Sequence, residues 1–231
     1  MEPMNEAVPA CKSLLEATAN TRKLGGCESA RIWRSDAPLT RIEADENRLR
    51  ENGITTLIDL RTDAETGRKP CAYAEREGFR YYHIAITEGA IPPRCLEEVP
   101  VVYMKMAFQR EMADVFRLIA AAEGGVMYFC AAGKDRTGVV SAVLQLTAGV
   151  DHGTIIRDYA ASRDYNRVRL EAFLAEHPEL DRKAVLANEL SMERFIALFL
   201  GQFGDADAYF RSSGLTEAEI ARLRAKVPGR A

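Results

Sequence analysis

Short apolar runs of strand length alternate along the chain with longer stretches in which apolar residues recur every three or four positions. Two continuous runs, Ile54 to Leu60 and Val126 to Phe129, predict buried strands. Alternation in Ala30 to Arg34, and the apolar stretch Phe79 to Ile86, predict two more strands. Helical spacing predicts helices over 41–51, 96–122, 139–150, 168–175, 181–187, 192–203 and 216–226. Strands that alternate with helices indicate an α/β fold.

One strand, Val126 to Phe129, ends at a cysteine, a tight loop follows, and the apolar helical run Val139 to Leu146 begins directly afterwards. Unpaired N–H groups at a helix start bind an oxyanion and favour a thiolate, so we expect Cys130 to be ionised at neutral pH. Arg136 lies six positions on and can place its planar fork across two phosphate oxygens. Thr137 can donate its hydroxyl to the sulfur. The pattern predicts a phosphate-binding thiol site.

The context of Cys130 separates it from the other cysteines. Of the five cysteines, only Cys130 has an arginine six residues later. Gly133 permits a close approach of the loop backbone, and Gly138 follows at the start of the helix. The alternative interpretation is a buried cysteine that ends a core strand, as many free cysteines do. The complete strand, loop and helix pattern favours the functional interpretation.

Residues 130–138 read Cys-Ala-Ala-Gly-Lys-Asp-Arg-Thr-Gly. This loop resembles that of the cysteine-dependent phosphatases, in particular the bacterial tyrosine/serine, dual-specificity-like and lipid-active branch. The resemblance implies a central, mostly parallel sheet flanked by helices, with a helical lid or insert and a helical C-terminal region. It also implies attack by Cys130 on phosphorus, a cysteinyl-phosphate intermediate, and no need for a metal or other cofactor. That family usually has a histidine before the cysteine, and Phe129 replaces it here, which is expected to affect the rate more than the reaction type.

Two further stretches resemble motifs of the same family. Residues 20–26 resemble its Asn-x-Arg-Asp-Leu-Gly-Gly motif, with Lys23 in place of the aspartate, and the resemblance implies that Arg22 braces the active-site wall. Residues 158–162 resemble its Asp-Tyr-x-x-Ser motif, and we expect them to pack behind the loop and support it. The expected substrate-binding residues are Ala131, Ala132, Gly133, Lys134, Arg22 and Asp63. The expected catalytic residues are Cys130, Arg136, Asp135 and Thr137.

Three carboxylates are candidates for the general acid. Asp135 ranks first, because the equivalent aspartate has been given this role in relatives with Gly-Lys-Asp-Arg. Asp63 follows the strand that ends at Leu60, so it can face the same crevice as Cys130 or cap the next helix. Glu88 lies in a predicted flexible loop, near the place where many related phosphatases carry a mobile acid. The sequence leaves the choice open.

The substrate and the role of residues 96–122 also stay open. The expected substrates are proteins with phosphotyrosine or phosphoserine and, because Lys134 adds a cation to the loop, phosphoinositides. The alternative function is a catalytically weak pseudo-phosphatase that binds phosphorylated partners, motivated by Phe129 and Lys23. The apolar stripe in 96–122 suits either a core helix pair or a lid over the site.

Composition narrows the class of protein. The chain has 231 residues, 47% of them hydrophobic, which suffices for one domain, expected over 11–229 after a weakly structured lead of residues 1–10. The net charge of −3 gives no support to a nucleic-acid partner. No signal peptide or membrane-length apolar stretch is evident, so we expect a cytoplasmic protein without membrane insertion, although export without a signal stays open. The oligomeric state is open.

Overall fold

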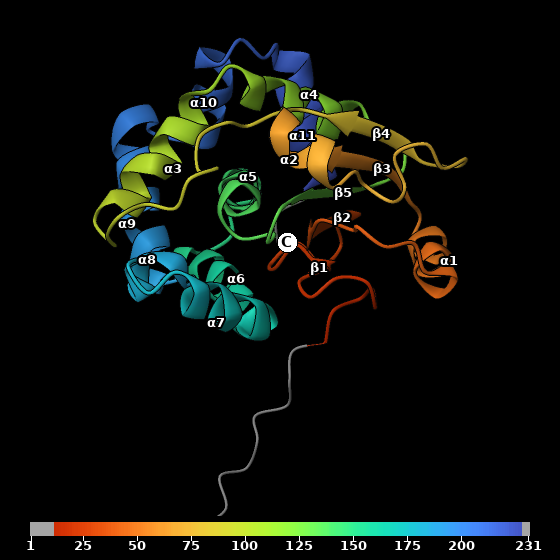
Figure 1. Cartoon of the computed structure of the whole chain (residues 1–231). Helices are drawn as coiled ribbons and strands as arrows, with labels where there is room; N and C mark the ends of the chain where they lie inside the picture. Colours follow the sequence, from red (N-terminus) through yellow and green to blue (C-terminus); the bar gives the residue numbers. More distant parts are fainter. Residues whose placement is uncertain (1–11, 228–231) are drawn as a thin grey trace, which may run out of the picture.

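The computed structural model describes residues 12–227, which are built around a five-stranded sheet (Figure 1). The strands are β1 (Arg22–Lys23), β2 (Ile32–Asp36), β3 (Ile54–Asp59), β4 (Arg80–His83) and β5 (Gly125–Cys130). Their order across the sheet is β1-β2-β5-β3-β4. Only β1 pairs in the antiparallel sense, and the other neighbours are parallel. The predicted α/β fold with a mostly parallel sheet is confirmed.

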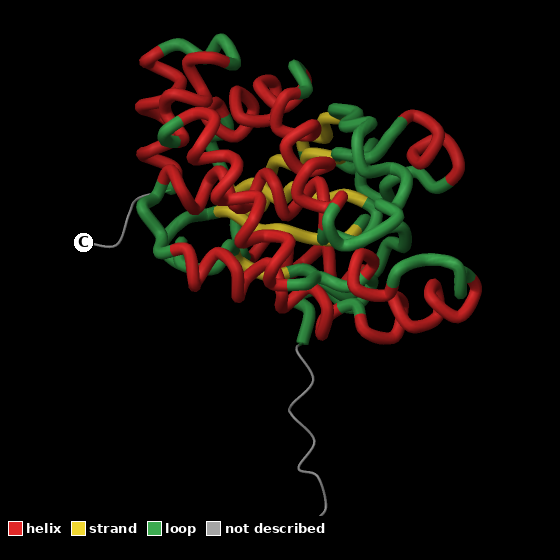
Figure 2. Tube along the Cα trace, turned by 90° about the vertical axis from the view of Figure 1, so that its left-hand side faces the viewer, coloured by secondary structure: helices red, strands yellow, loops and turns green. Residues whose placement is uncertain are grey.

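Helices surround this sheet and supply most of the described chain. They are α1 (Glu43–Glu51), α2 (Asp63–Arg68), α3 (Glu98–Phe108), α4 (Glu111–Ala121), α5 (Asp135–Thr147), α6 (His152–Tyr165), α7 (Arg167–Glu176), α8 (Arg182–Val185), α9 (Glu189–Phe203), α10 (Ala206–Ser212) and α11 (Glu217–Lys226). Figure 2 shows the strands in the interior, with helices crowded in front of them. The larger apolar cluster joins α3, α4, α5, α9, α10 and α11 to the sheet. A smaller cluster, which includes Trp33, Leu49, Leu57 and Phe129, packs elsewhere on the same sheet.

Most predicted elements are present, with shifted ends. The run Phe79 to Ile86 is a strand only over β4, and α10 had no counterpart in the predicted helices. Residues 96–122 form two helices: α4 buries Met112, Val115 and Ile119 in the core. The other helix, α3, lines the cavity described below. The predicted lead, residues 1–10, lies outside the described residues, as do residue 11 and the end of the predicted domain.

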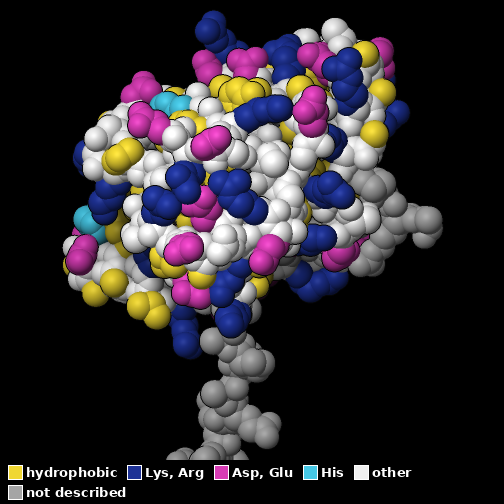
Figure 3. All heavy atoms as spheres, turned by 90° about the vertical axis from the view of Figure 1, so that its right-hand side faces the viewer, with side chains coloured by type: hydrophobic (Ala, Val, Ile, Leu, Met, Phe, Trp, Pro, Cys, Tyr) yellow, Lys and Arg dark blue, Asp and Glu magenta, His cyan; other side chains and the backbone are white. Residues whose placement is uncertain are grey.

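Two features of the outer surface bear on partners. Within residues 12–227, no helix combines the length and the apolar character needed to cross a bilayer. On the face seen in Figure 3, basic and acidic side chains are interspersed rather than segregated, which agrees with the small net charge of −3.

Candidate active site

Cys130 is the last residue of β5, the strand between β2 and β3, and only 3% of it is exposed. The loop after it leads into α5, whose first residue is Asp135. Parallel strands β2, β3 and β5 end at this edge, where open α/β sheets bind ligands. A cavity of about 200 Å³ opens over Cys130. Its walls are Glu65, Gly89, Ala90, Pro92, Pro93, Val102, Tyr103, Met106, Ala131, Ala132, Lys134, Asp135, Arg136, Arg169, Leu170, Phe173, Ala184 and Val185.

Side chains from outside the loop bind the carbonyl groups of residues 131–133. The Asn20 amide donates to the carbonyls of Ala132 (2.9 Å) and Gly133 (3.0 Å), and the Asn166 amide donates to that of Ala132 (2.9 Å). Arg34 donates to the Gly133 carbonyl at 2.9 Å, and Arg169 donates to the Ala131 carbonyl at 2.7 Å. The C=O and N–H of one peptide group point in opposite directions within its plane, so holding these carbonyls from behind favours loop N–H groups that face the cavity. The result is a concave nest of donors that suits an oxyanion.

Gly133 allows the loop to lie close against β2. Its φ of +65° is in the left-handed region that glycine adopts without strain. A Cβ at this position would lie 2.5 Å from the carbonyl carbon of Ser35, and backbone atoms cannot yield as a flexible side chain can. The expected close backbone approach at Gly133 is therefore present.

Behind the loop lies a buried polar network in which Arg22 and Arg34 form ion pairs with Asp158 and hydrogen bonds with Ser162. Arg34 Nη1 contacts Asp158 Oδ2 at 2.7 Å, and Arg22 Nε contacts Asp158 Oδ1 at 3.2 Å. Both arginines also donate to the Ser162 hydroxyl, at 3.1 and 3.3 Å. Burial and the neighbouring Arg34 lower the pKa of Arg22 to about 10, so it stays protonated at neutral pH. Arg22 does not line the cavity, and its link to the loop runs through the side chain of Asn20. Asp158 and Ser162 reach the loop through Arg34, which donates to the Gly133 carbonyl.

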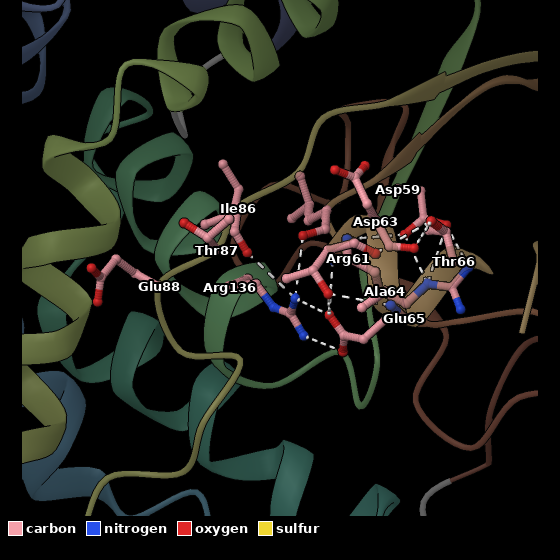
Figure 4. Close-up of polar contacts among 12 residues, drawn as sticks. Asp59, Arg61, Asp63, Ala64, Glu65, Thr66, Ile86, Thr87, Glu88 and Arg136 are labelled. Carbon is pink, nitrogen blue, oxygen red and sulfur yellow. Dashed lines mark hydrogen bonds and ion pairs between the residues drawn. The ribbon is translucent and has the colours of Figure 1, made fainter. Parts of the chain in front are cut away.

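Arg136 points into the cavity and is held by Glu65 of α2 (Figure 4). The two terminal nitrogens of its guanidinium lie 2.6 and 2.8 Å from the two Glu65 carboxylate oxygens. Burial opposes ionisation of Glu65, but the bonds from Arg136 and Thr62 prevail and lower its pKa to about 2. The sequence pattern alone did not indicate a role for Glu65 in the site. The one signal in the sequence was the Thr-x-x-Glu pattern of a capping box, which Glu65 forms with Thr62. That pattern accounts for a glutamate here without a role in the active site.

Asp63 and Glu88, two of the expected acids, do not line the cavity. The Asp63 side chain is 95% exposed, and its Oδ1 lies 3.8 Å from His83 Nδ1. Asp63 is the first residue of α2, and Thr62 is the cap of that helix. In Figure 4 the Glu88 carboxylate is directed away from Arg136, and the Glu88 backbone N–H donates to Gln109 at 3.0 Å. On the helix α2 it is the side chain of Glu65, not that of Asp63, that faces Arg136.

Asp135 does line the cavity, and its carboxylate has two polar neighbours. The phenol of Tyr103 donates to Oδ1 at 2.6 Å, and Lys134 Nζ lies 3.3 Å from the same oxygen. Lys134 is itself buried and donates to the Val185 carbonyl. The lysine ammonium therefore faces protein oxygens rather than an open basic mouth.

Thr137 is fully buried on α5, and its hydroxyl has no hydrogen-bond partner among the described residues. The expected hydroxyl-to-sulfur bond is thus not formed in this structure. Among residues 12–227, no cluster of three histidine, cysteine, aspartate or glutamate side chains could hold a metal ion.

A thiol at the end of a central parallel strand, a loop held by its carbonyls and an arginine in the same cavity form an arrangement that suits a phosphate. The comparisons with known proteins agree. The model of the "Tyrosine phosphatase family" matches residues 14–228. A tyrosine-protein phosphatase of Nostoc commune is 30% identical over 206 residues, covering 80% of this chain and 70% of the relative. The chain therefore belongs to the tyrosine phosphatase family and is a phosphatase.

Two further similar proteins are a second curated phosphatase and a solved structure. The triple specificity protein phosphatase PtpB of Mycobacterium tuberculosis is 30% identical over 138 residues, covering 52% of this chain and 50% of the relative. Among solved structures, P. aeruginosa TpbA in complex with pTyr is 16% identical, with a TM-score of 0.37, and covers 96% of this chain and 99% of that one.

Proposed function

We propose that this phosphatase hydrolyses phosphate monoesters through a cysteinyl-phosphate, with Cys130 as the nucleophile. The supporting observation is that Cys130, Arg136 and the loop residues Ala131, Ala132, Lys134 and Asp135 line one cavity. The Cys130 sulfur attacks phosphorus, the bond to the leaving oxygen breaks, and water then cleaves the S–P bond. Loop N–H groups and the Arg136 fork stabilise the equatorial oxygens during both steps. In this mechanism the Thr137 hydroxyl, which has no partner among the described residues, donates to the sulfur after a change of side-chain rotamer.

Asp135 is the proposed general acid. It lines the cavity, whereas Asp63 is exposed and Glu88 is directed elsewhere. Glu65 also lines the cavity, but with a pKa of about 2 it is ionised at neutral pH and has no proton to give. In the first step Asp135 protonates the leaving oxygen, and in the second its carboxylate takes a proton from water.

The walls of the cavity favour an aromatic phosphate ester. Val102, Met106, Leu170 and Phe173 line its sides, so the ring of phosphotyrosine would be buried against apolar side chains while its phosphate reaches the loop. Lys134 is occupied by Val185 and Asp135, so it does not supply the free cation that a highly phosphorylated inositol would use. We therefore place phosphotyrosine proteins first, with phosphoserine proteins and phosphoinositides as further substrates for the same assay.

The test is hydrolysis of an aryl phosphate in EDTA by the wild type, Cys130→Ser and a matched control, Cys71→Ser. Cys71 is also buried and free but lies in the smaller apolar cluster. We expect metal-independent turnover that Cys130→Ser abolishes and Cys71→Ser retains. No turnover by the wild type, with phosphopeptide still bound, would instead indicate the pseudo-phosphatase alternative.

A further inference from the structure

Three helices meet at the first residue of α5, and each contributes one polar side chain. Tyr103 comes from α3, Tyr159 from α6 and Asp135 from α5. The Tyr103 phenol donates to Asp135 Oδ1 at 2.6 Å, and the two phenol oxygens lie 2.7 Å apart. Because the single proton of Tyr103 is directed to Asp135, Tyr159 must donate to Tyr103. Two hydroxyls in series therefore end on one carboxylate oxygen, an arrangement in which each bond strengthens the next.

The surroundings hold this chain of hydroxyls in place. Tyr103 is fully buried and packs edge-on against Tyr159 and Phe195, with ring centroids 6.0 and 5.9 Å apart. Burial, together with the nearby Asp135 carboxylate, raises the pKa of Tyr103 well above its ordinary value, so the phenol keeps its proton. Among the described residues, the polar contacts of the Asp135 side chain are all made by Oδ1. The other oxygen, Oδ2, is thereby left to carry the transferable proton.

We propose that Tyr103 is a positioning residue for the general acid: its phenol holds Oδ1 of Asp135 so that the carboxyl group presents Oδ2 to the leaving group. The inference rests on the proposed function, because Asp135 must transfer the proton. As the S–P bond forms and the P–O bond breaks, that proton passes to the ester oxygen and leaves a carboxylate. The Tyr103 hydroxyl stabilises this carboxylate until water returns a proton to it.

The test compares kcat/KM for phenyl phosphate, whose leaving group needs the proton, with that for 2,4-dinitrophenyl phosphate, whose leaving group does not. We expect Tyr103→Phe to lower kcat/KM about tenfold on phenyl phosphate and less than about twofold on the dinitrophenyl ester. The matched control is Tyr209→Phe. It removes another buried hydroxyl that contacts α3, since Tyr209 donates to the Ala107 carbonyl at 2.8 Å, and it should leave the ratio of the two rates unchanged.

A double-mutant cycle separates this inference from the proposed function. Asp135→Asn should itself slow phenyl phosphate selectively, and adding Tyr103→Phe to it should slow the reaction no further. If Asp135→Asn slows both esters equally, the acid assignment fails and the positioning role fails with it. If Asp135→Asn is selective but Tyr103→Phe slows both esters equally, only the positioning role is overturned.

Tyr159→Phe keeps the inference testable should Tyr103→Phe fail to fold. It removes only the hydroxyl behind Tyr103, so the same selective loss should be seen, reduced to about threefold. The positioning role of Tyr103 would be overturned if Tyr159→Phe left kcat/KM at the wild-type value on both esters, or lowered it by the same factor on both. Thermal unfolding of every variant establishes that the rates belong to folded protein.

Discussion

Arg136 is the side chain whose orientation most directly decides whether the loop can bind a phosphate. A free arginine at the mouth of a cavity samples many rotamers, and ordering it costs free energy at every binding event. The two bonds from Glu65 remove that freedom in advance. A guanidinium has five N–H groups, so a bidentate pair with Glu65 still leaves donors for phosphate oxygens. Glu65 therefore orients the Arg136 guanidinium and still leaves N–H donors for the phosphate.

Replacing Glu65 by glutamine tests this preparation. Glu65→Gln keeps the size of the side chain but loses the charge and one acceptor oxygen, so we expect kcat/KM for an aryl phosphate to fall about 10- to 100-fold. The matched control is Asp63→Asn, two positions away on α2, whose exposed side chain should leave kcat/KM within about twofold. An equal loss in both variants would mean that α2 as a whole, rather than the Glu65 carboxylate, supports the site.

Gly133 offers a second test at a single residue. Gly133→Ala places a Cβ 2.5 Å from the Ser35 carbonyl carbon and imposes a left-handed φ of +65° on alanine. The loop must move, and we expect kcat to fall about 100-fold with a loss of stability of about 1–3 kcal/mol. Gly201→Ala is the control, because its Cβ meets nothing within 4 Å on α9. That change should stabilise the protein by up to about 1 kcal/mol.

At the scale of elements, Asp158 ties α6 to β1 and β2. Its single negative charge pairs with both Arg22 and Arg34, so removing that charge leaves two buried cations without a counter-ion. We expect Asp158→Asn to lower the free energy of unfolding by about 3–5 kcal/mol at neutral pH, measured with urea. Asp164→Asn, an exposed change on the same helix, should alter it by less than about 0.5 kcal/mol.

The same pair of variants predicts a dependence on pH. Burial alone would raise the pKa of Asp158, but Arg34 and Arg22 prevail and lower it below its ordinary value. The stabilisation is therefore complete above the unfolded pKa, about 3.9, and is lost as the pH falls toward the folded pKa. The stability gap between wild type and Asp158→Asn should stay constant above about pH 5 and shrink below about pH 4. A gap that persists undiminished to pH 3 would contradict this origin.

The elements also explain what the sequence could and could not predict. Cys130, Arg136 and Asp135 lie within seven consecutive positions of one strand-loop-helix unit, so local sequence was enough to propose them. Glu65 and Tyr103 reach the same cavity from 71 and 32 residues away along the chain. Glu65 was accounted for as the capping-box partner of Thr62, and Tyr103 lay in the predicted helical segment 96–122 with no motif around it. Only the three-dimensional structure reveals that the Glu65 carboxylate reaches Arg136 and that the Tyr103 phenol reaches Asp135.

At the scale of the whole molecule, the two apolar clusters meet on one sheet. Met127 and Phe129 of β5 belong to the smaller cluster, whereas Val126, Tyr128 and Cys130 of the same strand belong to the larger one. Both clusters therefore include side chains of β5, and each stabilises the strand on which the other depends. The active-site loop extends directly from this shared strand, so its geometry is expected to persist until both clusters unfold.

This sharing predicts that the described chain unfolds as one cooperative unit. The single tryptophan, Trp33, lies in the smaller cluster, while most of the helices that dominate circular dichroism pack on the larger one. Urea transitions followed by tryptophan fluorescence and by circular dichroism should therefore coincide. Phe199→Ala in the larger cluster and Leu57→Ala in the smaller should each shift both transitions together, by about 2–5 kcal/mol. If Leu57→Ala moved only the fluorescence transition, the smaller cluster and β2 would form a separate unit that unfolds while the helices remain.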